Sequence, residues 1–239
     1  MAIIETGSLI FMDIETASGK ANFEELSEDW QALWNKKAGK TITDDATLES
    51  HYHDKAALFA EFGRVVCISF GYYRASGSER KLRIKSIARE DEKALLQEFC
   101  DDLKQFEKHH RGWAFAGHNI REFDIPYLSR RILINGLELP ESMRFYDKKP
   151  WDILLVDTMQ FWRFGDFKSY ISLELLAAAL DIPSPKDDID GSMVGEIFWK
   201  DKDLKRIAVY CQKDVLTVAN IIRKLNGKPL LKSEEVEYV

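Results

Sequence analysis

Three acidic segments, each attached to an apolar stretch, constrain this chain more than any other feature. Asp13 and Glu15 end an apolar stretch that begins at Leu9. Asp124 follows a second apolar stretch, and Asp214 lies in a helical pattern near the end of the chain. If the fold brings these four carboxylates together, they repel one another unless cations neutralise them. The pattern therefore indicates a site for two metal ions.

Apolar periodicity predicts the elements that carry these segments. Strands are expected at 8–14, 65–73, 82–87, 113–118 and 153–158, the second and third forming a hairpin. Helices are expected at 22–37, 45–62, 90–108, 124–135, 171–180, 192–199 and 203–225. An early meander followed by alternating strands and helices predicts an α/β fold with a mixed central sheet flanked by helices. We expect one domain over 1–239, a helical insertion at about 19–62, and a frayed tail after Gly227.

Composition limits the environment and the partners. The net charge of −6 argues against a surface that wraps a nucleic-acid duplex, but a narrow groove for a strand end is compatible with it. No apolar run approaches the roughly 20 residues that span a bilayer. The N-terminus has no secretory signature, and the three cysteines are too widely spaced for a disulfide framework, so we expect a cytoplasmic protein. Lys186 is a candidate phosphate contact or a solvated lysine.

Each acidic segment also has a purely structural interpretation. Asp13 and Glu15 are two apart, so in a strand they share one face, but that face could already be exposed. Asp124 could be a helix cap. Tyr210 and Asp214 are four apart and share a helix face, which also fits a half-buried tyrosine beside a solvated aspartate.

Taken in order, the segments resemble the three exonuclease motifs of the DEDD superfamily, also called DnaQ-like. These motifs are Asp-x-Glu, Asn-x-x-x-Phe-Asp and Tyr-x-x-x-Asp, and the tyrosine is typical of the DEDDy branch. The tryptophan-rich insertion after Thr16, the segment 61–69 and Asp190-Gly191 are similar to predicted stand-alone exonucleases related to the proofreading domain of family B DNA polymerases. The resemblance spans roughly residues 8–225.

This resemblance implies a ribonuclease H-like fold and a metal-dependent 3′–5′ exonuclease. Such an enzyme hydrolyses phosphodiester bonds at the 3′ end of nucleic acid and releases nucleoside 5′-monophosphates. We expect single-stranded DNA as the substrate, with RNA as the alternative, and two Mg²⁺ or Mn²⁺ ions as cofactors. The expected metal ligands are Asp13, Glu15, Asp124 and Asp214; Tyr210 completes the catalytic set, and Thr16, Asn119 and Phe123 are expected to bind substrate.

Two other functions fit the same residues. One is a non-catalytic module that binds nucleic acid or a polymerase, and the other is an endonuclease of ribonuclease H type. The histidine pairs 51/53 and 109/110 offer a weaker transition-metal alternative, because no further ligand lies at zinc spacing. Since the sequence given carries no polymerase domain, we expect any proofreading to act in trans.

Overall fold

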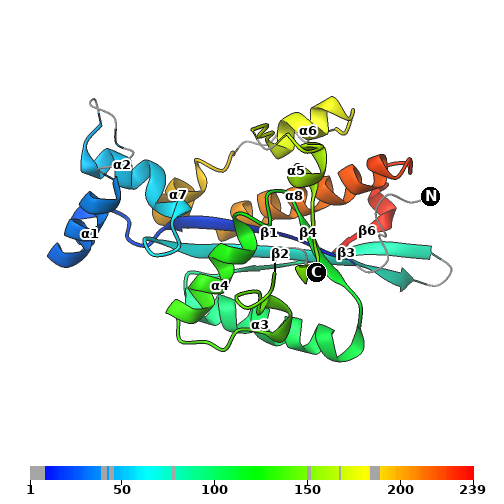
Figure 1. Ribbon diagram of the computed structural model, residues 1–239, viewed down its shortest axis with the longest axis horizontal. Coiled ribbons are helices and arrows are strands. Elements are labelled where there is room, and N and C mark those ends of the chain that lie inside the picture. Colours follow the sequence, from blue (N-terminus) through cyan, green and yellow to red (C-terminus); the bar gives the residue numbers. More distant parts are fainter. Residues whose placement is uncertain are drawn as a thin grey trace.

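The computed structural model describes residues 9–38, 42, 46–76, 79–149, 152–166, 168–183 and 189–239. Within them, a mixed sheet has the strand order β5-β4-β1-β2-β3-β6 (Figure 1). The strands are β1 Leu9–Ser18, β2 Gly63–Ser76, β3 Glu79–Ala88, β4 Ala114–Gly117, β5 Leu155–Asp157 and β6 Val236–Tyr238. The pairs β1–β2 and β2–β3 are antiparallel, whereas β1–β4, β4–β5 and β3–β6 are parallel.

Helices cover both faces of this sheet (Figure 1). The α-helices are α1 Glu28–Ala38, α2 Leu48–Lys55, α3 Glu92–His109, α4 Asp124–Ile134, α5 Thr158–Trp162, α6 Leu173–Ala179, α7 Val194–Glu196 and α8 Leu204–Leu225. Short 3-10 turns lie at Phe23–Glu25, Ala56–Leu58, Glu141–Met143 and Ser233–Glu235, and a π-helical turn spans Ile197–Asp201. Among the described residues, no helix is long and apolar enough to cross a membrane.

The two faces of β1 are buried against different helices. Leu9 and Phe11 pack against the apolar stripe of α8, which includes Val215 and Ile222. The alternate residues of β1, such as Met12, point into the larger core that α3 and α4 share with the sheet. Because side chains alternate along a strand, every odd-numbered residue in the regular part of β1 faces α8.

The insertion between β1 and β2 has a small core of its own. Trp34 is completely buried there, and its ring packs at 5.2 Å from Tyr52 and 4.9 Å from Phe62. The Gly19 amide donates to the Phe62 carbonyl at 2.7 Å, which closes the insertion where it leaves and rejoins the sheet. Figure 1 shows α1 and α2 beyond one end of the sheet.

The predicted α/β class with a mixed, helix-flanked sheet is confirmed. The expectation of a frayed tail after Gly227 is wrong, because β6 pairs with β3 and extends the sheet. The expected helix at 22–37 is a 3-10 turn followed by α1, and the short helix α5 was not expected. Lys186 and the turn of the β2–β3 hairpin lie outside the described residues.

Candidate active site

The first two carboxylates lie on the α8 face of β1. Asp13 pairs with Ser69 and Glu15 with Cys67 in regular antiparallel register, so the two side chains share one face. The register shifts only after Glu15, between Glu15 and Thr16. A register shift of this kind, as in a β-bulge, changes the direction of the strand, and here it comes just beyond the acidic pair.

Helix α8 brings the third acidic segment to this face. The thiol of Cys211 lies 3.3 Å from Asp13 Oδ2 and donates to it. Potential ligand atoms of Asp13, Glu15 and Cys211 all lie within 4.8 Å of one another. Asp214, one turn further along α8, is near enough that its negative charge raises the pKa of both Asp13 and Glu15. Strand β1 and helix α8 thus gather three carboxylates from two distant segments.

The fourth carboxylate enters from α4. Asp124 Oδ1 accepts a hydrogen bond from the Ile14 amide, between the two acids of β1, at 3.2 Å. The N-cap position of α4 is Phe123, and Asp124 is already the first helical residue. Asp124 is therefore not the N-cap residue, although its carboxylate interacts with its own amide in the first turn of α4 as well as with the Ile14 amide of β1.

Burial and mutual repulsion make these groups reluctant to ionise. Burial is the main cause that raises the pKa of Asp13 and Glu15 well above their ordinary values, and the neighbouring carboxylates raise them further. Burial also raises the pKa of Asp124 to about 7, despite the opposing hydrogen bonds from its own amide and from the Ile14 amide. Oxygen-rich, anionic donor sets of this kind suit hard divalent cations, and bound cations would relieve the repulsion. The residues therefore fit a divalent metal site.

Asn119 is held beside this cluster in a strained conformation. Its φ is +59°, a region that non-glycine residues adopt rarely and asparagine most readily. Its side-chain Oδ1 is buried and has no hydrogen-bond partner within the described part of the chain. A buried acceptor without a partner is costly, and this one is available to a ligand that donates a hydrogen bond.

Asp157, the last residue of β5, fixes the turn that carries Asn119. Its carboxylate accepts hydrogen bonds from the amides of Asn119 at 3.0 Å and Arg121 at 3.1 Å. It also caps α5 through the amides of Met159 and Gln160. Sequence reasoning missed both Asp157 and Cys211. The available signals were an aspartate that ends an apolar strand, as Asp13 does, and a thiol between Tyr210 and Asp214.

The other expected site residues lie at the margin of the cluster. Tyr210 is one turn before Asp214 on α8 and lines a cavity of about 270 Å³ together with Arg206 and Lys213. Thr16 is partly buried just past the bulge in β1. Phe123 is half-buried and packs against Tyr127 at 5.2 Å, so its ring is mainly part of the core.

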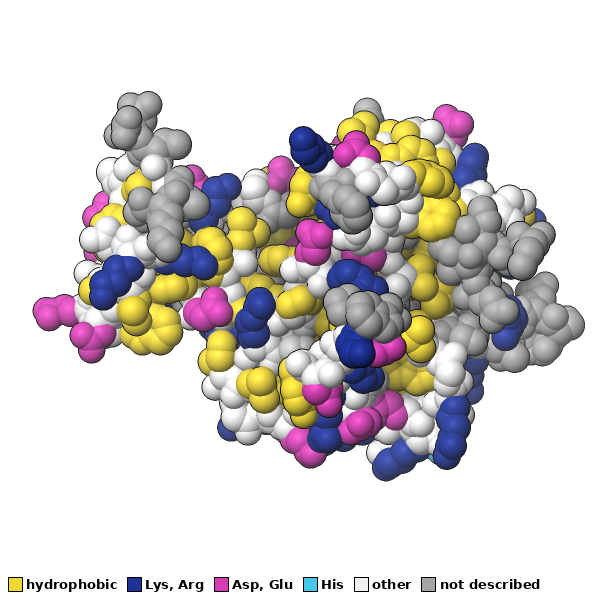
Figure 2. Space-filling model, in the orientation of Figure 1, with side chains coloured by type: hydrophobic (Ala, Val, Ile, Leu, Met, Phe, Trp, Pro, Cys, Tyr) yellow, Lys and Arg dark blue, Asp and Glu magenta, His cyan; other side chains and the backbone are white. Residues whose placement is uncertain are grey.

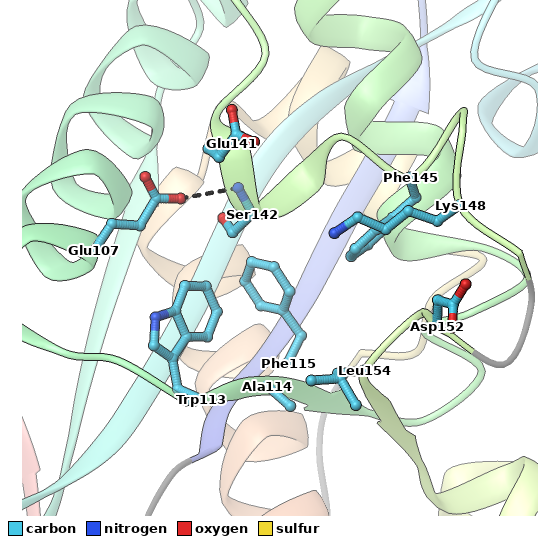
Figure 3. Close-up of a pocket in the computed structure, with 11 residues that line it drawn as sticks. Glu107, Trp113, Ala114, Phe115, Glu141, Ser142, Phe145, Lys148, Asp152 and Leu154 are labelled. Carbon is cyan, nitrogen blue, oxygen red and sulfur yellow. Dashed lines mark hydrogen bonds between the residues drawn. The ribbon is translucent and has the colours of Figure 1, made fainter.

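A second cavity, of about 330 Å³, lies where β4 begins (Figure 3). Asn119 and Asp124 follow the other end of β4 in the sequence. Trp113 and Phe115 form part of its wall, and Glu107 accepts a hydrogen bond from the Ser142 amide there. Its charged lining residues are Glu107, Glu141, Asp152 and Lys148. Three acids and one lysine make this cavity a poor place for a phosphate backbone.

The fold and the cluster define a ribonuclease H-like protein with four neighbouring carboxylates. Residues 57–222 match the family described as predicted 3′-5′ exonucleases related to the exonuclease domain of PolB, and the chain belongs to this family. The matched region contains Asp124 and Asp214 but begins after Asp13 and Glu15.

A solved structure supports the fold independently. The chain is similar to the family B DNA polymerase from the hyperthermophilic archaeon Pyrobaculum calidifontis, with a TM-score of 0.57 and 16% sequence identity. The similarity covers 91% of this chain, and therefore includes most of what the family match leaves out, but only 24% of the polymerase chain. A search among curated proteins gave no match.

Proposed function

We propose that this protein is a metal-dependent 3′–5′ exonuclease that hydrolyses the terminal phosphodiester bond of single-stranded DNA and releases nucleoside 5′-monophosphates. The observation that carries the proposal is the meeting of Asp13, Glu15, Asp124 and Asp214 from three distant segments. Burial raises the pKa of Asp13, Glu15 and Asp124, and such buried acids are expensive to maintain without a ligand that requires them. Family membership supports the same reaction class.

These four side chains would hold two divalent cations, Mg²⁺ or Mn²⁺. When bound, the cations supply Lewis acidity and offset the negative charge of the phosphate. Tyr210, one turn before Asp214, would orient the attacking water through its hydroxyl. Cys211 steadies Asp13 by donating to its carboxylate. Asn119 Oδ1, which has no hydrogen-bond partner among the described residues, would accept a hydrogen bond from the 3′ hydroxyl of the terminal nucleotide.

Thr16 and Phe123 have smaller proposed roles. Thr16 follows the metal-binding acids directly and would contact the terminal nucleotide through its hydroxyl. Phe123 would border the position of the terminal base with the exposed part of its ring. The three cysteines are free, buried thiols, which supports a reducing compartment, and we propose the cytoplasm.

The proposal is tested with 3′- and 5′-labelled single strands of DNA and RNA, incubated with Mn²⁺ or with EDTA. We expect stepwise shortening from the 3′ end that EDTA abolishes. Asp214→Asn should remove most of the activity, whereas Asp101→Asn, an exposed aspartate on α3, should not. Full activity of Asp214→Asn, or shortening in excess EDTA, would show that the assigned site is wrong.

Two outcomes would identify the alternatives. An endonuclease would still cut a strand whose 3′ end is blocked by a phosphorothioate linkage or a terminal spacer. A non-catalytic module would bind labelled strands but shorten none of them, and calorimetry would detect no Mn²⁺ binding at the carboxylates.

A further inference from the structure

The segment between α5 and α6 leaves two large aromatic rings in solvent. Phe164 is 80% exposed and Tyr170 is 70% exposed. Figure 2 shows exposed hydrophobic side chains over α6, which follows this segment directly. Aromatic rings normally contribute their large apolar area to a core or an interface. Neither ring is used by the core of this protein.

The start of this segment is attached to the second acidic motif. Arg163, itself only 6% exposed, donates from Nη1 to Glu122 Oε1 at 3.0 Å. Gln160 donates to the same oxygen at 2.7 Å. Glu122 lies between Asn119 and Asp124 in the sequence. The start of the segment between α5 and α6 is therefore attached to the turn that carries Asn119, proposed to bind substrate, and Asp124, proposed to bind metal.

The end of the segment is attached to the same turn from its other side. His118 Nε2 lies 2.9 Å from the carbonyl oxygen of Ile171, and its Nδ1 lies 2.9 Å from the hydroxyl of Thr158. Burial lowers the pKa of His118, so the ring is neutral and one nitrogen donates to the Ile171 carbonyl. Because His118 directly precedes Asn119, the segment is anchored on both sides of that residue.

Local geometry holds both rings outward. Phe164 has a φ of +46°, a left-handed conformation that is a true outlier for a bulky residue, and Gly165 follows at +90°. The Arg163 guanidinium lies 4.4 Å from the centre of the Tyr170 ring, so a cation–π contact orients that ring. Phe164 meets the Phe161 ring only edge-on, at 5.5 Å between centroids, so most of its ring stays in solvent despite the strained backbone, and this combination points to a role in binding.

We propose that Phe164 and Tyr170 form a stacking platform for the nucleobases just upstream of the 3′ end of a single strand, an inference that rests on the proposed exonuclease function. Exposed bases stack on aromatic rings regardless of their identity, because every base has a π-face. Bases in a duplex have both faces occupied by their neighbours, so the platform selects unpaired ends. The position beside Asn119 places the platform next to the nucleotide to be removed.

Binding is measured by fluorescence anisotropy, with fluorescein-labelled ten-nucleotide oligothymidylate and Mn²⁺, in an Asp214→Asn background that prevents cleavage. Replacing both rings by alanine should weaken binding at least about tenfold. Phe164→Trp should retain the affinity because it retains a ring. Tyr238→Ala is the matched control, since Tyr238 is 50% exposed on β6 at the opposite edge of the sheet and should not matter.

An oligonucleotide with abasic sites upstream of its 3′ nucleotide isolates the stacking. The protein with both rings intact should bind this abasic oligonucleotide as weakly as the double alanine variant binds the ordinary strand. Thermal unfolding of the double alanine variant provides the control that it is folded. Equal affinity of the double alanine and parent proteins for the ordinary strand would overturn the proposal and leave the rings to a protein partner. Failure of the proposed exonuclease function would give a different result. The rings would still be needed for binding, but the wild-type protein would not cleave the strand.

Discussion

Replacing Asp124 by asparagine should stabilise the metal-free protein while destroying the metal site. Asp124 is 4% exposed, and its folded-state pKa is raised from 3.8 to about 7, first by burial. An acid with a raised pKa favours the folded state only while it is protonated, so this contribution is lost as the pH rises from about 4 to about 7. Asparagine has no such charge and can still accept the Ile14 amide at Oδ1.

The magnitude follows from the pKa difference. About three pKa units at 1.36 kcal/mol each mean that ionised Asp124 lowers the free energy of unfolding of the wild type by about 4 kcal/mol at pH 8. At pH 5 the folded protein keeps Asp124 protonated, and the same calculation gives a destabilisation of the wild type of under about 2 kcal/mol. Asp124→Asn should therefore gain more stability over the wild type at pH 8 than at pH 5.

The assay is urea unfolding in EDTA at both pH values, with Asp101→Asn as the exposed control. Adding Mn²⁺ at about 100 times its Kd should reduce the advantage of the variant at pH 8 from about 4 to about 1 kcal/mol, because binding stabilises only the wild type, by about 2.7 kcal/mol. If Asp124→Asn is less stable than the wild type in EDTA at pH 8, the buried charge does not carry the expected cost. A stability difference that stays the same at both pH values would contradict the raised pKa of Asp124.

Three further outcomes are expected. Mn²⁺ affinity should fall between pH 8 and pH 6, because the raised pKa values of Asp13 and Glu15 mean that binding displaces protons; calorimetry in two buffers of different ionisation heat should detect this release. Glu92→Gln should lower the free energy of unfolding by about 3–5 kcal/mol, because it leaves Arg131 buried without its ion pair, and a loss under about 1 kcal/mol in urea unfolding would contradict this. Tyr210→Phe should lower kcat about a hundredfold without changing Mn²⁺ affinity, and an unchanged kcat would exclude the hydroxyl from the reaction.

Sequence periodicity was sufficient for the parts of the site that local geometry determines. Residues two apart in a strand share a face, so the pairing of Asp13 with Glu15 on one side of β1 followed from the sequence alone. Residues four apart on a helix share a face, which placed Tyr210 and Asp214 on the same side of α8. The mixed sheet also followed from the order of the apolar stretches.

Features that depend on distant pairing were not predictable in the same way. Asp124 looked like a cap because its local sequence fits one, and only the packing of α4 against β1 shows that it bonds Ile14. The strand β6 is short and charged, and it forms because the open edge of β3 accepts it. The role of Asp157 depends on a contact across 38 positions with Asn119, which no local pattern contains.

Because Asp157 holds the turn that carries Asn119, the geometry of the site depends on a short strand at the edge of the sheet. β5 is three residues long and lies at the edge, paired only with β4 within the described sheet. Local opening of β5 would withdraw Asp157 and free the amides of Asn119 and Arg121 while the centre of the sheet stays intact. Hydrogen exchange at these two amides should therefore be faster than in β1, and it would report how often the protein visits a form that cannot position its substrate.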